Sequence, residues 1–143
     1  MIRGMVILDT NVISEMTRIA PEPNVVAWYL RQDSGSIFTT TVTLAEVLYG
    51  LNLLPEGSRR DRLSEFADGF FRNEMAGKIL SFDQTAAIHY ATIRAAKHQL
   101  GLSMSPLDAQ IAAIAAAAGA SVATRNVDDF KHCGVTVVNP WIA

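Results

Sequence analysis

Residues that bind zinc or form disulfides are scarce in this sequence. Of its 143 residues only Cys133 is a cysteine, and only three are histidines, at positions 89, 98 and 132. A single cysteine excludes a disulfide framework within the chain and is typical of a protein from a reducing cytoplasm. No acid or nucleophile stands at a spacing that pairs it with a histidine, so we expect the histidines to lie on the surface or on helix faces.

The sequence also lacks a strong net charge and a long apolar run. Lys and Arg number 12 against 14 Asp and Glu, which gives a formal net charge of −2. This bulk charge does not suggest a nucleic-acid partner, although local patches can still steer polyanions. The longest run of small apolar residues, Ile111–Ala120, is shorter than the roughly 18 residues of a membrane-spanning helix. Because the N-terminus also has too little charge and apolar length for a signal peptide, we expect a cytoplasmic protein with no membrane partner.

What the sequence does contain is the composition of a globular domain with a sizeable core. Half of the residues are hydrophobic and 18% are charged, and the length predicts a single domain spanning residues 1–143. Short apolar runs predict strands at 5–8, 36–40, 78–82, 121–124 and 135–138. The helical patterns between them lie at 11–18, 24–32, 44–53, 59–71, 84–100 and 107–118. Apolar strands joined by helices predict an α/β fold, with three α/β/α layers and a mainly parallel five-stranded central sheet.

Acidic residues follow several of these elements at positions where parallel sheets bind ligands. Asp9 ends the first strand, Glu46 opens the helix after the second strand, and Asp108 opens the last long helix. Asp128 and Asp129 follow the fourth strand. Ligands in such sheets lie outside the carboxyl ends of the strands, near a reversal of strand order. The sequence therefore predicts that these acids gather at one edge of the sheet.

Each of these acids also has a structural explanation. Asp9 can cap the helix that follows it, and Thr43 and Glu46 have the spacing of a capping box, in which Thr43 caps the helix. Ser105 and Asp108 have the same spacing. The acidic pair after the fourth strand fits a solvated turn. These explanations account for one residue at a time, whereas a shared site accounts for all of them.

Three or four carboxylates in one place need a cation. Two unit charges about 4 Å apart repel by about 4 kcal/mol at an effective dielectric constant of about 20. Without a counter-ion, some of the acids would take up protons at neutral pH. An all-oxygen set without paired His or Cys suits Mg²⁺ or Mn²⁺ rather than zinc. Such ions orient or activate a water for attack on a phosphodiester.

Five motifs stand in order along nearly the whole chain, and they are ILDTNVISE, TLAEVLYGL, SPLDAQIAAIA, ATRNVDDF and VVNPW. Together they resemble the PIN domain, and more closely the VapC and FitB-like toxins of bacterial type II toxin–antitoxin systems. The resemblance implies a Mg²⁺-dependent endoribonuclease toxin that acts on RNA and forms a homodimer. It also implies a small DNA-binding antitoxin whose tail occupies the active-site groove, and through which the complex reaches operator DNA.

The same resemblance assigns roles to individual positions. Asp9 and Asp108 match the principal metal ligands, and Glu46 and Asp129 complete the acidic pocket of catalytic residues. In the family, other residues orient the acids or a water on the metal, and here the matching residues are Thr10, Asn11, Thr124 and Asn126. Such outer-shell groups hold ligands in place.

The sequence does not determine which residue completes the acidic site after Asp9, Glu46 and Asp108. Asn126 stands where relatives have an Asp or Asn, and it supplies no charge. Whether Asn126, Asp128 or Asp129 completes the site, and whether one or two metals bind, is therefore undecided. Asp129 is preferred because it directly precedes Phe130, as an acid does in the relatives. Arg125, beside the expected site, is a candidate contact for RNA phosphate.

Other basic residues are expected to have no site role. Arg94, Lys97 and His98 share one face of the helix at 84–100, and such faces are generally solvated. The apolar face of the same helix is the expected dimer contact.

Two other function classes are less consistent with the sequence. A non-catalytic PIN-like module that binds RNA or protein has no need of intact Asp9, Glu46 and Asp108, whose charges repel one another. A receiver-like phosphoacceptor domain would have an acidic pair after the first strand, where Asp9 stands alone, and a phosphorylatable Asp at the end of the third strand. There Asp83 instead opens a long helix.

Overall fold

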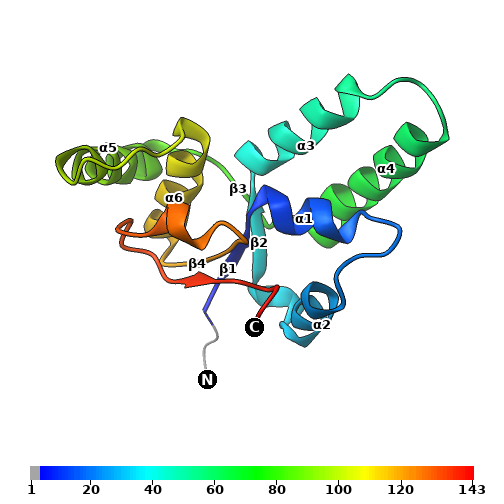
Figure 1. Ribbon diagram of the computed structural model, residues 1–143, viewed down its shortest axis with the longest axis horizontal. Helices are drawn as coiled ribbons and strands as arrows, with labels where there is room; N and C mark the ends of the chain where they lie inside the picture. Colours follow the sequence, from blue (N-terminus) through cyan, green and yellow to red (C-terminus); the bar gives the residue numbers. More distant parts are fainter. Residues whose placement is uncertain (1–3) are drawn as a thin grey trace.

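The computed structural model of the protein describes residues 4–143, in which short strands alternate with longer helices (Figure 1). The strands are β1 (Val6–Leu8), β2 (Ile37–Thr40), β3 (Ile79–Leu80), β4 (Ser121–Ala123) and β5 (Val137–Val138). The α-helices are α1 (Thr10–Met16), α2 (Pro23–Arg31), α3 (Thr41–Leu53), α4 (Ser58–Gly69), α5 (Gln84–Gln99) and α6 (Pro106–Ala118). Shorter turns form the 3₁₀ helices η1 (Ser34–Ser36) and η3 (Val127–Phe130) and the π-helix η2 (Phe70–Glu74). Within residues 4–143, no helix has the length and apolar character needed to cross a membrane.

The strands form one parallel sheet in the order β3-β2-β1-β4-β5. The predicted α/β fold with a parallel five-stranded sheet is therefore confirmed. The chain adds β2 and β3 on one side of β1, and later adds β4 and β5 on the other side. The strand order thus reverses between β1 and β4. The carboxyl ends of these two strands border the crevice where sheets of this kind bind ligands.

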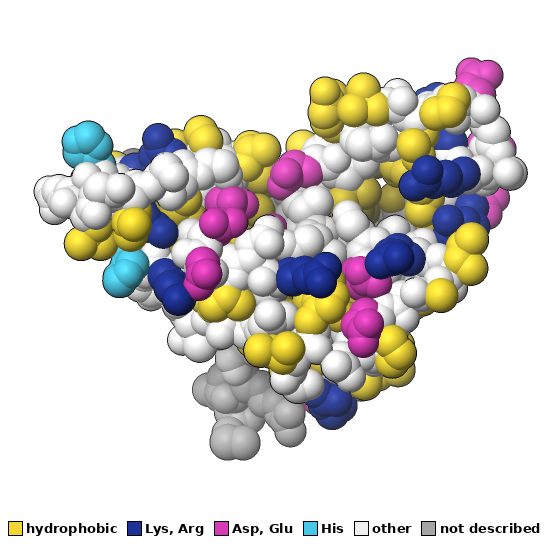
Figure 2. Space-filling view, viewed as in Figure 1, with side chains coloured by type: hydrophobic (Ala, Val, Ile, Leu, Met, Phe, Trp, Pro, Cys, Tyr) yellow, Lys and Arg dark blue, Asp and Glu magenta, His cyan; other side chains and the backbone are white. Residues whose placement is uncertain are grey.

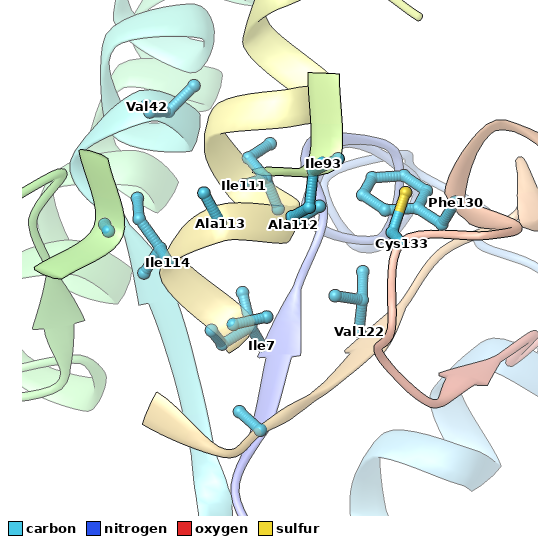
Figure 3. Close-up of a cluster of buried hydrophobic side chains, with 13 residues drawn as sticks. Ile7, Val42, Ile93, Ile111, Ala112, Ala113, Ile114, Val122, Phe130 and Cys133 are labelled. Atoms are coloured by element: carbon cyan, nitrogen blue, oxygen red, sulfur yellow. The ribbon is translucent and has the colours of Figure 1, made fainter. Parts of the chain in front are cut away.

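Residues of the central strands alternate between two cores. Ile7 and Val122 belong to a cluster with α5 and α6 (Figure 3), whereas Leu8 and Ala123 belong to a second cluster with α1, α2 and α4. Successive residues of a strand face opposite sides of the sheet. A strand that is covered on both faces is therefore apolar at most positions, which is why the strands read as mainly apolar runs; the exceptions in β2 are the buried residues Thr39 and Thr40.

Helix α6 is enclosed because its side chains are small and its ends are well capped. Its residues from Ile111 to Ala115 are all buried, and four of the last five residues of the helix are alanine. The helix begins at Pro106 after Ser105, whose Oγ accepts a hydrogen bond from the Asp108 amide at 3.1 Å. It ends at Gly119, which has a φ of 67° that favours glycine.

Helix α3 begins three residues earlier than the sequence predicts. Its N-cap is Thr40, the last residue of β2, and the Thr40 hydroxyl accepts from the Thr43 amide at 3.1 Å. The structural alternative for Glu46, a capping box with Thr43 as the cap, is therefore wrong. The reason is that β2 passes directly into α3 without a loop, so the cap is the extended residue at the strand end.

The edge strands are shorter than predicted, since β3 covers only 79–80 and β5 only 137–138. Each of them pairs with a neighbour on one side alone, so fewer residues are held in the ladder. The helix expected at 59–71 ends as α4 at Gly69 and continues as the π-helical turn η2.

The two cores predict where the sheet is sensitive to truncation. Ile7 is fully buried in β1, whereas Ile19 is 87% exposed. Ile7→Ala should lower the free energy of unfolding by about 2–5 kcal/mol, because it removes buried methyl groups and leaves a cavity. Ile19→Ala is the matched control and should change it by less than about 0.5 kcal/mol. Urea unfolding of both variants checks this, and equal losses would contradict the assignment of Ile7 to the core.

Candidate active site

Asp9 is a buried carboxylate that directly follows β1. It is 4% exposed and serves as the N-cap of α1, with Oδ1 accepting from the Thr10 amide at 2.8 Å. Its other oxygen, Oδ2, accepts from the Thr124 hydroxyl at 2.8 Å and from Asn11 Nδ2 at 3.3 Å. Asp9 is thus a helix cap, and it also belongs to a polar network that extends beyond its own helix.

This network joins the ends of β1 and β4. Asn11 Nδ2 donates to Thr124 Oγ1 at 3.2 Å, and Asn11 Oδ1 accepts from the Arg125 amide at 3.2 Å. The Asn126 amide donates to the same Thr124 hydroxyl at 3.0 Å. Because Thr124 is fully buried, these bonds fix the chain after β4 against the chain after β1.

Glu46 reaches the site from α3 through a threonine. The Thr10 hydroxyl donates to Glu46 Oε1 at 2.8 Å, and it also lies 3.2 Å from Thr43 Oγ1. Glu46 therefore lies beside the residue that follows Asp9, although the two are far apart in sequence. In the sequence, Thr43 and Glu46 have the spacing of a capping box, and only the three-dimensional contact distinguishes the two arrangements.

The remaining acids approach from α6 and η3. The charge of Asp108, in the first turn of α6, acts on Asp9, and the charge of Asp129 acts on Asp108. Asp128 is fully exposed and forms an ion pair with Lys131 at 2.7 Å. That ion pair lowers the pKa of Asp128 below its usual value. Of the two neighbouring acids, Asp129 is therefore the one whose charge raises the pKa of Asp108, whereas Asp128 forms an ion pair at the surface.

The acids disturb one another's ionisation. The pKa of Asp9 is raised from 3.8 to about 6, chiefly by burial and further by the charges of Asp108 and Glu46. Hydrogen bonds from Thr124 and from the Thr10 amide oppose this rise. Burial also raises the pKa of Asp108, and the charge of Asp129 adds to that effect. Raised pKa values caused by burial together with specific charged neighbours are typical of functional sites.

The donor set of the site consists of oxygen ligands. Carboxylates of Asp9, Glu46, Asp108 and Asp129 and nearby hydroxyl groups suit a hard cation such as Mg²⁺ or Mn²⁺. Within residues 4–143, no group of three or more His, Cys, Asp or Glu side chains lies close enough together to hold a metal ion. An ion held by one or two carboxylates, with water in its other positions, fits this arrangement because Mg²⁺ usually keeps several waters.

Lys97 differs from its sequence interpretation. It is only 3% exposed, and its Nζ donates to the Asp129 carbonyl oxygen at 3.3 Å. The expectation that it lies on a solvated face is therefore wrong. Because a helix face is solvated only where no other element covers it, the helical spacing could not show that η3 packs over this lysine. Its companion His98 is exposed, as expected.

The surface at this edge of the sheet is concave. Figure 2 shows a hollow between the part of the molecule formed by α5 and α6 and the part formed by α3 and α4, with acidic side chains along it. A cleft of about 230 Å³ includes Thr10 and Glu46 in its lining, together with Leu51 and Arg59. An extended ligand at the acids therefore has an adjoining cleft in which to lie.

Comparisons with known proteins agree with this geometry. The sequence matches the PIN domain family over residues 6–135. It is 41% identical to plasmid stability protein StbB of Pseudomonas syringae pv. tomato, over 97% of this chain and 100% of that protein. Toxin FitB of Neisseria gonorrhoeae is 37% identical over 96% of this chain and 99% of its own length. VapC ribonuclease Y4jK of Sinorhizobium fredii is 36% identical over 96% and 98%.

Solved structures show the same relationship. The crystal structure of FitAcB from Neisseria gonorrhoeae superimposes with a TM-score of 0.91 at 37% identity, covering 97% of this chain and 100% of that one. The structure of FitAB bound to an IR36 DNA fragment gives a TM-score of 0.90 at 37% identity, covering 96% of each chain. Sequence and fold thus agree, and the chain belongs to the PIN domain family, in the group of the VapC and FitB toxins.

Proposed function

We propose that the chain is an endoribonuclease, the toxin of a type II toxin–antitoxin system, and that it hydrolyses RNA phosphodiester bonds with Mg²⁺ or Mn²⁺ in the acidic pocket. The observation that carries this proposal is the buried carboxylate of Asp9, whose pKa is raised chiefly by burial and further by the charges of Asp108 and Glu46. Keeping a buried carboxylate ionised among like charges costs free energy unless a cation binds beside it. The relatives named ribonuclease and toxin support the same function.

In this proposal Asp9 and Asp108 hold the metal, and Glu46 and Asp129 complete the acidic pocket. When bound, the ion would offset charge on the scissile phosphate and lower the pKa of an attacking water. The water gives up a proton as its oxygen bonds to phosphorus, the bond from phosphorus to one ribose oxygen breaks, and that ribose oxygen takes up a proton. The groups that orient the acids and the water are Thr10, Asn11, Thr124 and Asn126.

We also propose a small antitoxin as the protein partner, with operator DNA contacted only through it. This is supported by the FitAB structure, which is bound to a DNA fragment. We expect a homodimer in the cytoplasm, with each chain acting as a single domain. The exposure of Ile88 in α5 (65%) and of Leu100 just after it (56%) is consistent with the predicted contact of that helix.

RNA cleavage is the direct test of the proposal. Purified protein should cut RNA in the presence of Mg²⁺ or Mn²⁺, and EDTA should stop the reaction. Asp9→Asn and Asp108→Asn should each lower the rate at least about 100-fold, because each removes a charge that holds the metal.

The matched control is Asp128→Asn, which removes a carboxylate from the same region. Asp128 is fully exposed and paired with Lys131, so this variant should retain its activity. Persistent activity of the Asp9→Asn protein would contradict the metal assignment. RNA binding without any cleavage under these conditions would favour a non-catalytic module instead.

The raised pKa of Asp9 predicts how metal binding depends on pH. Between the unfolded value of 3.8 and the folded value of about 6, the folded protein binds the extra proton, so metal-free stability falls as pH rises through this range. Mg²⁺ competes with that proton, and its affinity should be about tenfold weaker at pH 5 than at pH 7.5. Titration of the rise in melting temperature with Mg²⁺ measures this.

Asp9→Asn should greatly reduce the Mg²⁺ effect at both pH values, because it removes a metal ligand, whereas Asp128→Asn should leave the effect and its pH dependence unchanged. A Mg²⁺ effect that has the same size at pH 5 and pH 7.5 in the unmodified protein would show that Asp9 does not contact the ion.

Expression in bacteria tests the toxin role separately. The protein should arrest growth, the Asp9→Asn variant should not, and co-expression of the small protein encoded beside the toxin should relieve the arrest. Normal growth at high levels of an enzyme that is active in vitro would count against a toxin. Viable-cell counts after induction give the measurement.

A further inference from the structure

We propose that Trp141 is a positioning residue, which holds the guanidinium of Arg125 beside the acidic pocket so that it binds an RNA phosphate next to the one that is cut. This inference rests on the proposed function. Arg125 lies with its guanidinium carbon 5.2 Å from the centre of the Trp141 ring, within the range of a cation–π contact. The two residues come from opposite ends of the last segment of the chain, after β4 and after β5.

The backbone of Arg125 is fixed by the same groups that fix Asp9. Its amide donates to Asn11 Oδ1 at 3.2 Å, and the Nδ2 of Asn11 lies 3.3 Å from Asp9 Oδ2. The preceding residue, Thr124, donates its hydroxyl to Asp9 at 2.8 Å. The start of the Arg125 side chain is therefore held at a constant position relative to the acid.

The Trp141 ring provides the second fixed point. The Trp141 amide donates to Asn139 Oδ1 at 2.9 Å, and its carbonyl oxygen accepts from Asn24 Nδ2 at 2.8 Å. The side chain is partly buried against the core cluster that includes Leu8 and Trp28. A ring held in this way offers a stable surface on which the planar guanidinium can stack, since arginine combines stacking with in-plane hydrogen bonding.

The hydrogen-bond donors of this guanidinium are open to a ligand. Within residues 4–143, no carboxylate forms an ion pair with Arg125, and its side chain makes no hydrogen bond to the protein. Arg125 itself is exposed. Guanidinium groups bind phosphate through two parallel hydrogen bonds. A fixed cation beside the acids would also offset the repulsion between the acidic pocket and RNA, which matters for a chain whose net charge is −2.

RNA is favoured over an acidic protein segment because the proposed function places a metal and a phosphodiester in the neighbouring pocket. The test measures binding of a labelled single-stranded RNA of random sequence in EDTA, where cleavage is excluded and the metal plays no part. Trp141→Leu and Arg125→Gln should each weaken binding by about three- to tenfold, and Arg125→Gln should reduce the salt dependence by about one phosphate contact. Trp141→Phe should retain most of the affinity, because it keeps an aromatic face.

The double variant distinguishes positioning from an independent contact. If Trp141 acts through Arg125, Trp141→Leu should cause no further loss in an Arg125→Gln background. In cleavage assays with Mg²⁺ the KM should rise while kcat is nearly unchanged, because the acids are intact. Arg72→Gln, which removes an exposed cation paired with Asp68, is the control for net charge and should bind RNA normally.

Several outcomes would overturn the inference. Additive losses in the double variant would show that Trp141 contacts RNA by itself. Unchanged RNA binding in both single variants, with weaker capture of the antitoxin, would assign the pair to the protein partner. If Trp141→Leu fails to fold, Trp141→Phe and Arg125→Gln still test the pair. RNA binding that depends on Arg125 and Trp141 but is never followed by cleavage would refute the nuclease and the place of this phosphate beside a cut bond, and would leave only the phosphate contact of Arg125.

Discussion

The buried charge of Asp9 is the constraint on which the rest of the structure depends. In the unfolded chain this carboxylate is hydrated and has a pKa near 3.8, whereas in the folded protein it is 4% exposed with a pKa of about 6. Without a counter-ion, keeping it ionised at neutral pH costs up to about 3 kcal/mol. This cost is what remains after the hydrogen bonds from Thr124 and the Thr10 amide have stabilised the ionised form, and a divalent cation would remove most of it. Capping α1 does not by itself require a carboxylate to be buried at this cost, so the cost supports a functional site.

The topology of the sheet supplies the partners of this carboxylate. Because the strand order reverses at β1 and β4, the chain brings a threonine 115 residues away into contact with Asp9. Direct passage from β2 into α3 places Glu46 against Thr10, 36 residues apart in sequence. Helix α6 is packed closely by its alanines, which sets Asp108 on the remaining side. Each acid is thus positioned by an element whose packing has its own apolar cause, and the rigidity of the site derives from the two cores.

Much of the fold was predictable because strands that are buried on both faces of the sheet have mainly apolar sequences. The apolar runs, the capping residue Ser105 and Gly119 all act within a few residues, so local patterns reveal them. The contact between Thr10 and Glu46 was not predictable in this way, since a capping box has the same residue types at the same spacing. Lys97 was misjudged for a similar reason. Helical periodicity shows which residues share a face, but it does not show that η3 covers that face.

Local patterns in the sequence were enough to predict the class of fold, the order of its elements and a set of candidate residues for binding a hard cation. These depend on residue type and on spacing along the chain, and both are local quantities. Only the tertiary structure decided which acids act on one another. The charges of Asp108 and Glu46 raise the pKa of Asp9. The charge of Asp129 raises the pKa of Asp108, whereas Asp128 pairs with Lys131. Electrostatic coupling depends on distance and burial, and these are fixed when the parallel sheet brings the ends of distant strands together.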